Sequence, residues 1–225
     1  MRRSISATTL AADLARFTAD HLQAGLAERD RVLLKAPTGS GKSTIGRQLA
    51  HRAGVPFIDL DHRLEQTIGT TIRSFFEAEG EARFRDLESQ ALADVAGQAG
   101  GMVLSTGGGA VLRPENRETL RQFGNVLYLR ASPEEIYRRV KHDRTRPLLQ
   151  GGNPMDKLRD LYAQRDGLYR ETAHYVIETG RPTVHTLVNM IMMQLEMAAG
   201  AQGEQVPHGA SDAPTSAGTP HADRS

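Results

Sequence analysis

The stretch from Ala36 to Thr44, Ala-Pro-Thr-Gly-Ser-Gly-Lys-Ser-Thr, combines glycines, a lysine and hydroxyls in a spacing suited to binding phosphate. Gly39 and Gly41 allow the backbone to curl, so that successive N–H groups point to one centre where an anion can bind. Lys42 can then reach the β- and γ-phosphates of a nucleotide, and the Ser43 hydroxyl can ligate Mg²⁺. The stretch therefore predicts a phosphate-binding loop (P-loop).

The flanking residues give this loop the expected setting. An apolar run, Val32–Leu34, precedes it, and apolar residues with helical spacing follow at Ile45 and Leu49. A buried strand that enters a glycine-rich turn and opens a helix is the context in which the motif binds phosphate. Ala36 replaces the usual first glycine, but a position still at the strand end does not need a positive φ. A chance glycine turn is the alternative.

Two carboxylates belong to the next apolar run. Residues Phe57–Asp61 predict a second short strand, whose end carries Asp59 and Asp61. Because ligands bind beyond the carboxyl ends of strands in open parallel sheets, both carboxylates are candidate site residues. The alternative for Asp61 is that it only caps the following helix.

Three consecutive glycines follow another apolar run. Met102–Ser105 predicts a third strand, which leads through Thr106 into Gly107, Gly108 and Gly109. Glycines at a strand end let a ligand contact bare backbone. The alternative is a merely flexible turn.

The remaining sequence alternates between strand and helix signals, which predicts an α/β fold with a doubly wound parallel sheet. Further strands are expected over 126–129 and 175–178. Helices are expected from the P-loop to Ala53, from Pro114 to Phe123, after Ser132, up to about Tyr169 and over about 183–197, with another helical region interrupted at Gly69 and Gly80. The basic segment from Lys141 to Pro154 predicts a lid. A solvated charge run is the alternative.

Three parts of the chain are expected. Residues 1–30 form an N-terminal extension, frayed over 1–9 and with a leading helix from about Leu10 to Ala27. Residues 31–198 form the P-loop domain, with a substrate-binding part at about 61–90 and a mobile lid at about 141–156. Residues 199–225 form a disordered tail, because only Val206 among them is a branched aliphatic residue and none is aromatic.

The composition excludes several classes of protein. The 225 residues include 28 basic and 27 acidic side chains, a net charge of +1, which does not suggest a polyanion-binding protein. Cysteine is absent, which excludes disulfides, and the eight histidines are scattered without zinc-site spacing. No apolar run is long enough to span a bilayer, and Met1-Arg2-Arg3 is not followed by a hydrophobic signal region. We expect a cytoplasmic protein without nucleic-acid or membrane partners.

The order of the motifs resembles shikimate kinase. The P-loop is followed by Asp-x-Asp, Phe-Arg-x-x-Glu, Gly-Gly-Gly, Arg-Pro-Leu-Leu and Arg-x-x-Leu-Tyr, between about Val32 and Leu195. The resemblance implies a nucleoside-monophosphate-kinase-like P-loop fold, with a five-stranded parallel sheet flanked by helices and a mobile lid. It also implies transfer of the γ-phosphoryl group of ATP to the 3-hydroxyl of shikimate, a step toward the aromatic amino acids, by a monomer that uses one Mg²⁺ per ATP.

The resemblance implies which residues bind ATP and the metal. Asp59 reaches the metal through water, Arg146 resembles the lid arginine that meets the phosphates, and Arg181 flanks the adenine. The expected ATP-binding residues are Gly39, Ser40, Gly41, Lys42, Ser43, Thr44, Arg146 and Arg181. Lys42, Asp61 and Arg146 are the expected catalytic residues.

The resemblance also implies a substrate site. Asp61 holds the shikimate hydroxyls and acts as, or stands in for, the base. Arg85 and Arg165 bind the substrate carboxylate, and Glu88 steadies Arg85 from behind. The backbone of Gly107, Gly108 and Gly109 completes the pocket. Gly167 stands where the family usually has proline.

Three other functions share part of this pattern. A gluconate kinase would have the same P-loop and fold, but Arg85, Arg165 and the triple glycine argue against it. A non-catalytic ligand sensor would sit behind a DNA-binding domain, for which there is no room before Val32. A scaffold that only binds nucleotide would not need the carboxylate-binding arginines.

Overall fold

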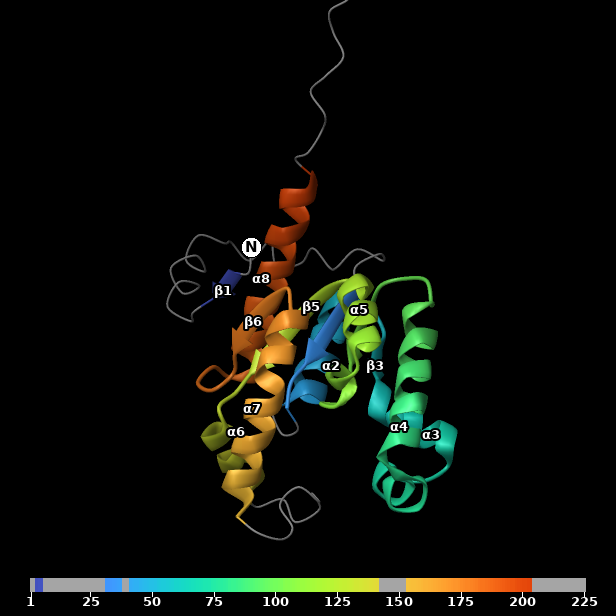
Figure 1. Cartoon of the computed structure of the whole chain (residues 1–225). Coiled ribbons are helices and arrows are strands. Elements are labelled where there is room, and N and C mark those ends of the chain that lie inside the picture. The colour runs from blue at the N-terminus through green and yellow to red at the C-terminus, as the bar shows by residue number, and fades with distance from the viewer. Residues whose placement is uncertain (1–2, 6–30, 38–40, 142–152, 204–225) are drawn as a thin grey trace, which may run out of the picture.

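The computed structural model describes residues 3–5, 31–37, 41–141 and 153–203, and these build a parallel sheet between two layers of helices (Figure 1). The sheet order is β1-β6-β5-β2-β4-β3, and every neighbouring pair is parallel. The strands are β1 (Arg3–Ile5), β2 (Arg31–Lys35), β3 (Phe57–Asp59), β4 (Met102–Ser105), β5 (Asn125–Arg130) and β6 (Tyr175–Glu178). The helices are α2 (Lys42–Ala53), α3 (Leu60–Ile68), α4 (Ile72–Ala96), η2 (Ala110–Leu112), α5 (Pro114–Phe123), α6 (Pro133–Val140), α7 (Pro154–Thr172) and α8 (Val184–Gly203).

Strand β2 lies in the middle of the sheet, between β4 and β5. Its residues Val32, Leu33 and Leu34 are all completely buried, because both faces of the sheet are covered. Val32 and Leu34 pack with α2 and α8, whereas Leu33 packs with the helices of the other face. The P-loop therefore follows a strand that is buried on both faces.

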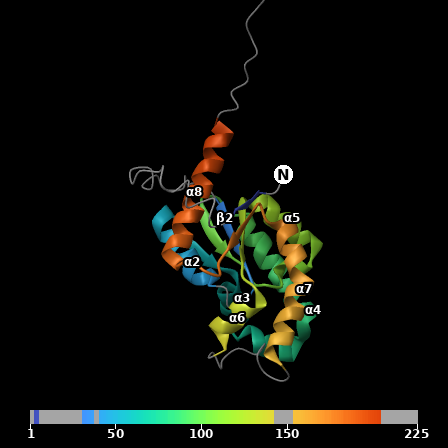
Figure 2. The same cartoon turned by 90° about the vertical axis from the view of Figure 1, so that its left-hand side faces the viewer.

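The two faces of the sheet are covered by different helices (Figures 1 and 2). Apolar residues of α2 and α8, among them Leu49 and Ile191, form one core cluster. The other cluster brings together α3, α4, α5 and α7 through residues such as Phe84, Leu120 and Tyr169. The helices of this second layer carry Asp61, Arg85 and Arg165, three of the six residues expected to bind the substrate.

Local signals in the sequence explain where several helices begin and end. Gly54 and Gly69, both in the left-handed region, end α2 and α3. Gly80, with φ 81°, bends α4, as the interruption in the sequence predicted. Ser132 and Glu135 form a reciprocal capping box at the start of α6, which confirms the predicted cap.

Some expectations differ from the structure. The five predicted strands are present, and β1 adds an edge strand within residues that we expected to be frayed. Strand β3 ends at Asp59, so the prediction of a strand through Asp61 is wrong. The chain turns into α3 at once, which lets Leu60 and Leu64 bury on one helical face.

The ends of the chain test the sequence predictions only in part. Helix α8 continues to Gly203, beyond the predicted end at Met197. The predicted leading helix, most of the lid and the segment 204–225 lie outside the described residues, so the division into three parts stays a prediction. Within the described part of the chain, no helix combines the length and apolar character needed to cross a membrane.

Two glycines inside helices lead to opposite predictions. A Cβ on Gly46 would overlap the ring of Phe57, whereas a Cβ on Gly167 would meet nothing within 4 Å. We expect Gly46→Ala to destabilise the protein by about 1–3 kcal/mol through overpacking. The matched change Gly167→Ala should stabilise it by about 0.5–1 kcal/mol, because alanine loses less backbone entropy in a helix. Denaturant unfolding measures both, and a stabilising Gly46→Ala would contradict the packing of α2 on β3.

Candidate active site

The end of the P-loop joins the sheet to the first turn of α2. Gly41, with φ 89°, is the residue before the helix, and Lys42 begins it. The Lys42 ammonium donates a hydrogen bond to the carbonyl of Ala36 at 3.1 Å, which holds the side chain along the loop. Gly39 and Ser40 lie outside the described residues, while Thr44 is exposed on the first turn.

Ser43 and Asp59, the two residues expected at the metal, lie together. The Ser43 hydroxyl donates to Asp59 Oδ2 at 2.8 Å, although the residues come from α2 and from the end of β3. One hydroxyl and one carboxylate suit Mg²⁺, which takes its remaining oxygen ligands from water and phosphate. Among the described residues no group of three histidines or carboxylates could hold a metal by itself.

Asp61 is a partly buried carboxylate in the first turn of α3. The residue at the N-cap position is Asp59, so the interpretation of Asp61 as a helix cap is wrong. Asp61 Oδ1 lies 2.6 Å from the place that a Cβ on Gly107 would take, which puts the carboxylate against the glycine turn. Burial raises the pKa of Asp61, and the positive charge of Lys42 opposes that rise.

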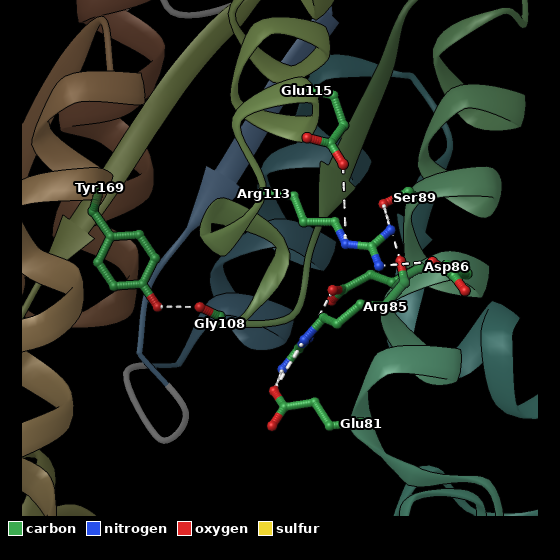
Figure 3. A network of polar contacts seen from close by, with 9 residues as sticks. Glu81, Arg85, Asp86, Ser89, Gly108, Arg113, Glu115 and Tyr169 are labelled. Atoms are coloured by element: carbon green, nitrogen blue, oxygen red, sulfur yellow. Dashed lines mark hydrogen bonds and ion pairs between the residues drawn. The ribbon is translucent and has the colours of Figure 1, made fainter.

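Arg85 is held in one orientation by two carboxylates and two rings. Its Nη1 donates to Glu88 Oε2 at 2.7 Å, and its Nη2 donates to Glu81 Oε1 at 2.9 Å (Figure 3). The guanidinium carbon lies 5.7 Å from the ring centre of Phe76 and 5.4 Å from that of Phe84. Only 13% of the Arg85 side chain is exposed, so the guanidinium is fixed before any ligand arrives.

The three glycines after β4 are packed against both arginines. A Cβ on Gly109 would overlap the Arg85 guanidinium, and a Cβ on Gly108 would lie 3.5 Å from Arg165 Nη1. The turn is also hydrogen-bonded, because the Tyr169 hydroxyl donates to the Gly108 carbonyl at 2.7 Å (Figure 3). Side chains are excluded here by close approach.

Arg165 carries the clearest sign that a ligand belongs here. Its Nε is buried and has no hydrogen-bond partner among the described residues. An unsatisfied buried donor on a charged group is costly, so an anion at this point would stabilise it.

The neighbouring Asp166 fixes this part of α7, since it accepts hydrogen bonds from Tyr128 at 2.8 Å and Arg170 at 2.7 Å. These contacts fix the position of α7 at Asp166, the residue directly before Gly167.

The structure does not show two other predicted residues at this place. Arg181 is exposed in the connection between β6 and α8, and Arg146 lies outside the described residues. Glu81 and Tyr169, which orient Arg85 and the glycine turn, were not predicted as site residues. The spacing of Glu81 four residues before Arg85 is the helical pair signal that could have identified it.

The P-loop at the end of a central parallel strand, with a carboxylate and two arginines beside it, defines a P-loop kinase fold of the nucleoside-monophosphate-kinase-like class. A sequence model of shikimate kinase matches residues 38–196. The chain belongs to the shikimate kinase family.

Individual relatives agree with this assignment. Shikimate kinase of Paracidovorax citrulli is 57% identical over 162 residues, which cover 71% of this chain and 88% of the relative. That of Ralstonia nicotianae is 53% identical and covers 79% of this chain and 90% of the relative. The solved shikimate kinase from Acinetobacter baumannii in complex with shikimate is 41% identical, with a TM-score of 0.70, over 81% of this chain and 98% of that one. A gluconokinase from Sinorhizobium meliloti, 17% identical with a TM-score of 0.52 over 80% of this chain and 98% of that one, shares the fold.

The hydrogen bond from Tyr169 to Gly108 gives a prediction for stability. Tyr169→Phe should destabilise the protein by about 1 kcal/mol at neutral pH, because the Gly108 carbonyl loses its donor. Tyr137→Phe is the matched control, since the Tyr137 hydroxyl has no partner among the described residues.

The same variant has a predicted pH dependence. Burial raises the pKa of Tyr169 from 10.0 to about 12, so the folded protein keeps a proton that the unfolded chain loses. This stabilisation is complete below the unfolded value and is lost as the pH rises through the folded one. The difference between the unaltered protein and Tyr169→Phe should therefore shrink between pH about 10 and about 12. Urea unfolding at a series of pH values measures it, and a constant difference would contradict the assignment.

Proposed function

We propose that this protein phosphorylates the 3-hydroxyl of shikimate with ATP, releasing ADP and 3-phosphoshikimate. The observation that supports it most is the placement of Arg85 and Arg165 on either side of the glycine turn, next to Asp61. Shikimate is a small carboxylate with several hydroxyls, so its site needs guanidinium groups for the anion and a carboxylate for the alcohols. This is the chemistry that the described residues bring together.

The substrate carboxylate would bind to the two arginines. Arg85 is already fixed by Glu81 and Glu88, and Arg165 Nε has an open donor among the described residues. A carboxylate between them would replace the missing partner and fix the ring of the substrate. The bare backbone of Gly107–Gly109 would let that ring approach closely.

Asp61 would receive the hydroxyl that attacks the phosphoryl group. It lies in the first turn of α3, close enough to Lys42 and Arg85 that their charges act on it. A carboxylate can accept the hydroxyl proton or orient the hydroxyl while the proton leaves with the product phosphate. Phosphoryl transfer needs mainly positioning and charge stabilisation, which Lys42 would supply at the γ-phosphate.

Mg²⁺ would bind between Ser43 and the phosphates, with Asp59 reaching it through water. When bound, the metal neutralises phosphate charge and aligns the β- and γ-phosphates. Arg146 on the expected lid would add a second cation at the phosphates, and Arg181 would flank the adenine. A lid that closes would also keep water from the phosphoryl group. The monomeric state and the cytoplasmic location stay predictions.

A substrate panel separates this function from its rivals. A coupled assay with Mg-ATP should show ADP release with shikimate and little with gluconate or quinate, and Lys42→Ala should abolish it. Turnover of gluconate above that of shikimate would favour a gluconate kinase. Shikimate binding without turnover would favour a ligand sensor, although Lys42, Asp59 and Asp61 argue against one.

Asp61→Asn tests the acceptor side of the reaction. Asparagine has nearly the same size but cannot take a proton, so turnover should fall by about 10²–10⁴-fold. The affinity for Mg-ATP should hardly change, because Ser43 and Asp59 are assigned to the metal. Asp94→Asn, the same change at an exposed position of α4, is the matched control. Turnover within a few-fold of the unaltered protein would contradict the role of Asp61.

The kcat of the reaction should also fall at low pH. Burial raises the pKa of Asp61 above 3.8, so its protonation stops the reaction at a higher pH than for an ordinary aspartate. Lys42 and Arg85 act against this rise, and Asp59 and Glu65 add to it. The acid limb of the kcat profile should be absent from the residual activity of Asp61→Asn.

A further inference from the structure

Lys35, the last residue of β2, is a buried lysine with no role in the site described above. Its side chain is 1% exposed, and its ammonium nitrogen has no hydrogen-bond partner among the described residues. A buried charge without compensation is strongly unfavourable, so this position needs an explanation. Lys35 directly precedes Ala36, so it lies at the carboxyl end of the central strand, where the P-loop begins.

The register of the sheet places Lys35 beside the start of the glycine turn. Leu34 of β2 pairs with Ser105, the last residue of β4, so the residues that follow them, Lys35 and Thr106, are neighbours. Their side chains point to the same face as Leu33, where α4 packs. The Thr106 hydroxyl is also buried and without a hydrogen-bond partner in the described part of the chain.

Glu88 reaches the same place from α4. Its side chain is 1% exposed, and its Oε1 lies 3.1 Å from the position that a Cβ on Gly107 would take. Its other oxygen accepts the hydrogen bond from Arg85. The carboxylate thus lies between Arg85 on one side and the backbone next to Lys35 on the other. Burial lowers the pKa of Lys35, and the negative charge of Glu88 acts against that change.

The charges around the glycine turn show why such a lysine matters. Arg85 is paired with two carboxylates, Glu81 and Glu88, and the carboxylate of Asp61 lies against the same turn. With Arg165 as the second cation, these five groups carry one excess negative charge, and the opposite charges of Lys42 and Asp59, which also act on Asp61, offset each other. The excess negative charge would repel a carboxylate ligand. One further buried positive charge cancels that excess.

We propose that Lys35 is the buried counter-cation of Glu88 and that, by offsetting this carboxylate, it leaves the charge of Arg85 available to the substrate carboxylate. Lys35 is then a positioning residue that acts through Glu88 and does not touch the substrate. The inference rests on the proposed function for its substrate, but the pairing of Lys35 with Glu88 can be tested without any turnover.

The kinetic test uses Lys35→Met, which keeps the length of the side chain and removes its charge. The KM for shikimate should rise about tenfold, the order of magnitude expected when one charge within the protein is removed at an effective dielectric constant of about 20. The KM for ATP and kcat should stay within about twofold. Arg83→Met removes a positive charge from an exposed position of α4 and should change none of these constants. An unchanged KM for shikimate in Lys35→Met would overturn the proposal.

A second substitution separates charge from packing. Adding Glu88→Gln to Lys35→Met removes the uncompensated carboxylate and keeps an acceptor for Arg85, so shikimate affinity should recover. If Lys35→Met acted only by disturbing the packing, the affinities for both substrates and the melting temperature would fall together. Adding Glu88→Gln would then not restore them. That pattern would also overturn the proposal.

Carbon-13 NMR of labelled lysine tests the pairing directly. The negative charge of Glu88 raises the pKa of Lys35 and the positive charge of Arg117, on α5, lowers it. Lys35 should therefore titrate at a lower pH in Glu88→Gln and at a higher pH in Arg117→Met. Failure of the unaltered protein to phosphorylate shikimate would refute the proposed function and leave this measurement intact. A Lys35 titration that is the same in all three proteins would refute the pairing.

Discussion

The buried ion pair between Arg85 and Glu88 is the interaction on which the site depends. Its atoms lie 2.7 Å apart and Glu88 is almost completely buried, so the guanidinium direction is set from inside the protein. Truncating one side chain of the pair, unlike a change to a neutral group that keeps the hydrogen bond, would leave the other side chain buried without this partner, which is strongly destabilising. The absence of a side chain at Gly109 follows from this pair, since the guanidinium fills the space where a Cβ would be.

The fold brings the other groups to the same point. Parallel strands β2, β3 and β4 end at one edge of the sheet, which places the P-loop, Asp59 and the glycine turn together. Helix α7 adds Arg165 from the opposite side, and Tyr169 ties that helix to Gly108. In the proposed reaction, ATP and the acceptor would meet where three strand ends and the helices α2, α3, α4 and α7 converge. Each carries negative charge, which the arginines and lysines would offset.

Much of this arrangement could be predicted from the sequence, because strong local signals coincide with the elements. The apolar runs predicted the five strands that position the site. Glycines marked the ends of helices, and Pro114 and Ser132 marked the starts of two others. The extension of β3 to Asp61 was wrong, because tertiary burial of Leu60 and Leu64 favoured a helix over the apolar alternation. The roles of Tyr169 and Lys35 depend on contacts between distant segments, for which one sequence carries no local signal.

In the proposed function, Arg85 and Arg165 together bind the carboxylate of shikimate. Calorimetric titration of shikimate and its methyl ester, with the unaltered protein and with Arg85→Ala and Arg165→Ala, tests it most directly. The unaltered protein should prefer the free acid by about 10-fold or more, as expected for charged hydrogen bonds of about 1.5–3 kcal/mol. Each variant should lose much of that preference while Mg-ATP affinity remains. An undiminished preference for the free acid in both variants would contradict the account.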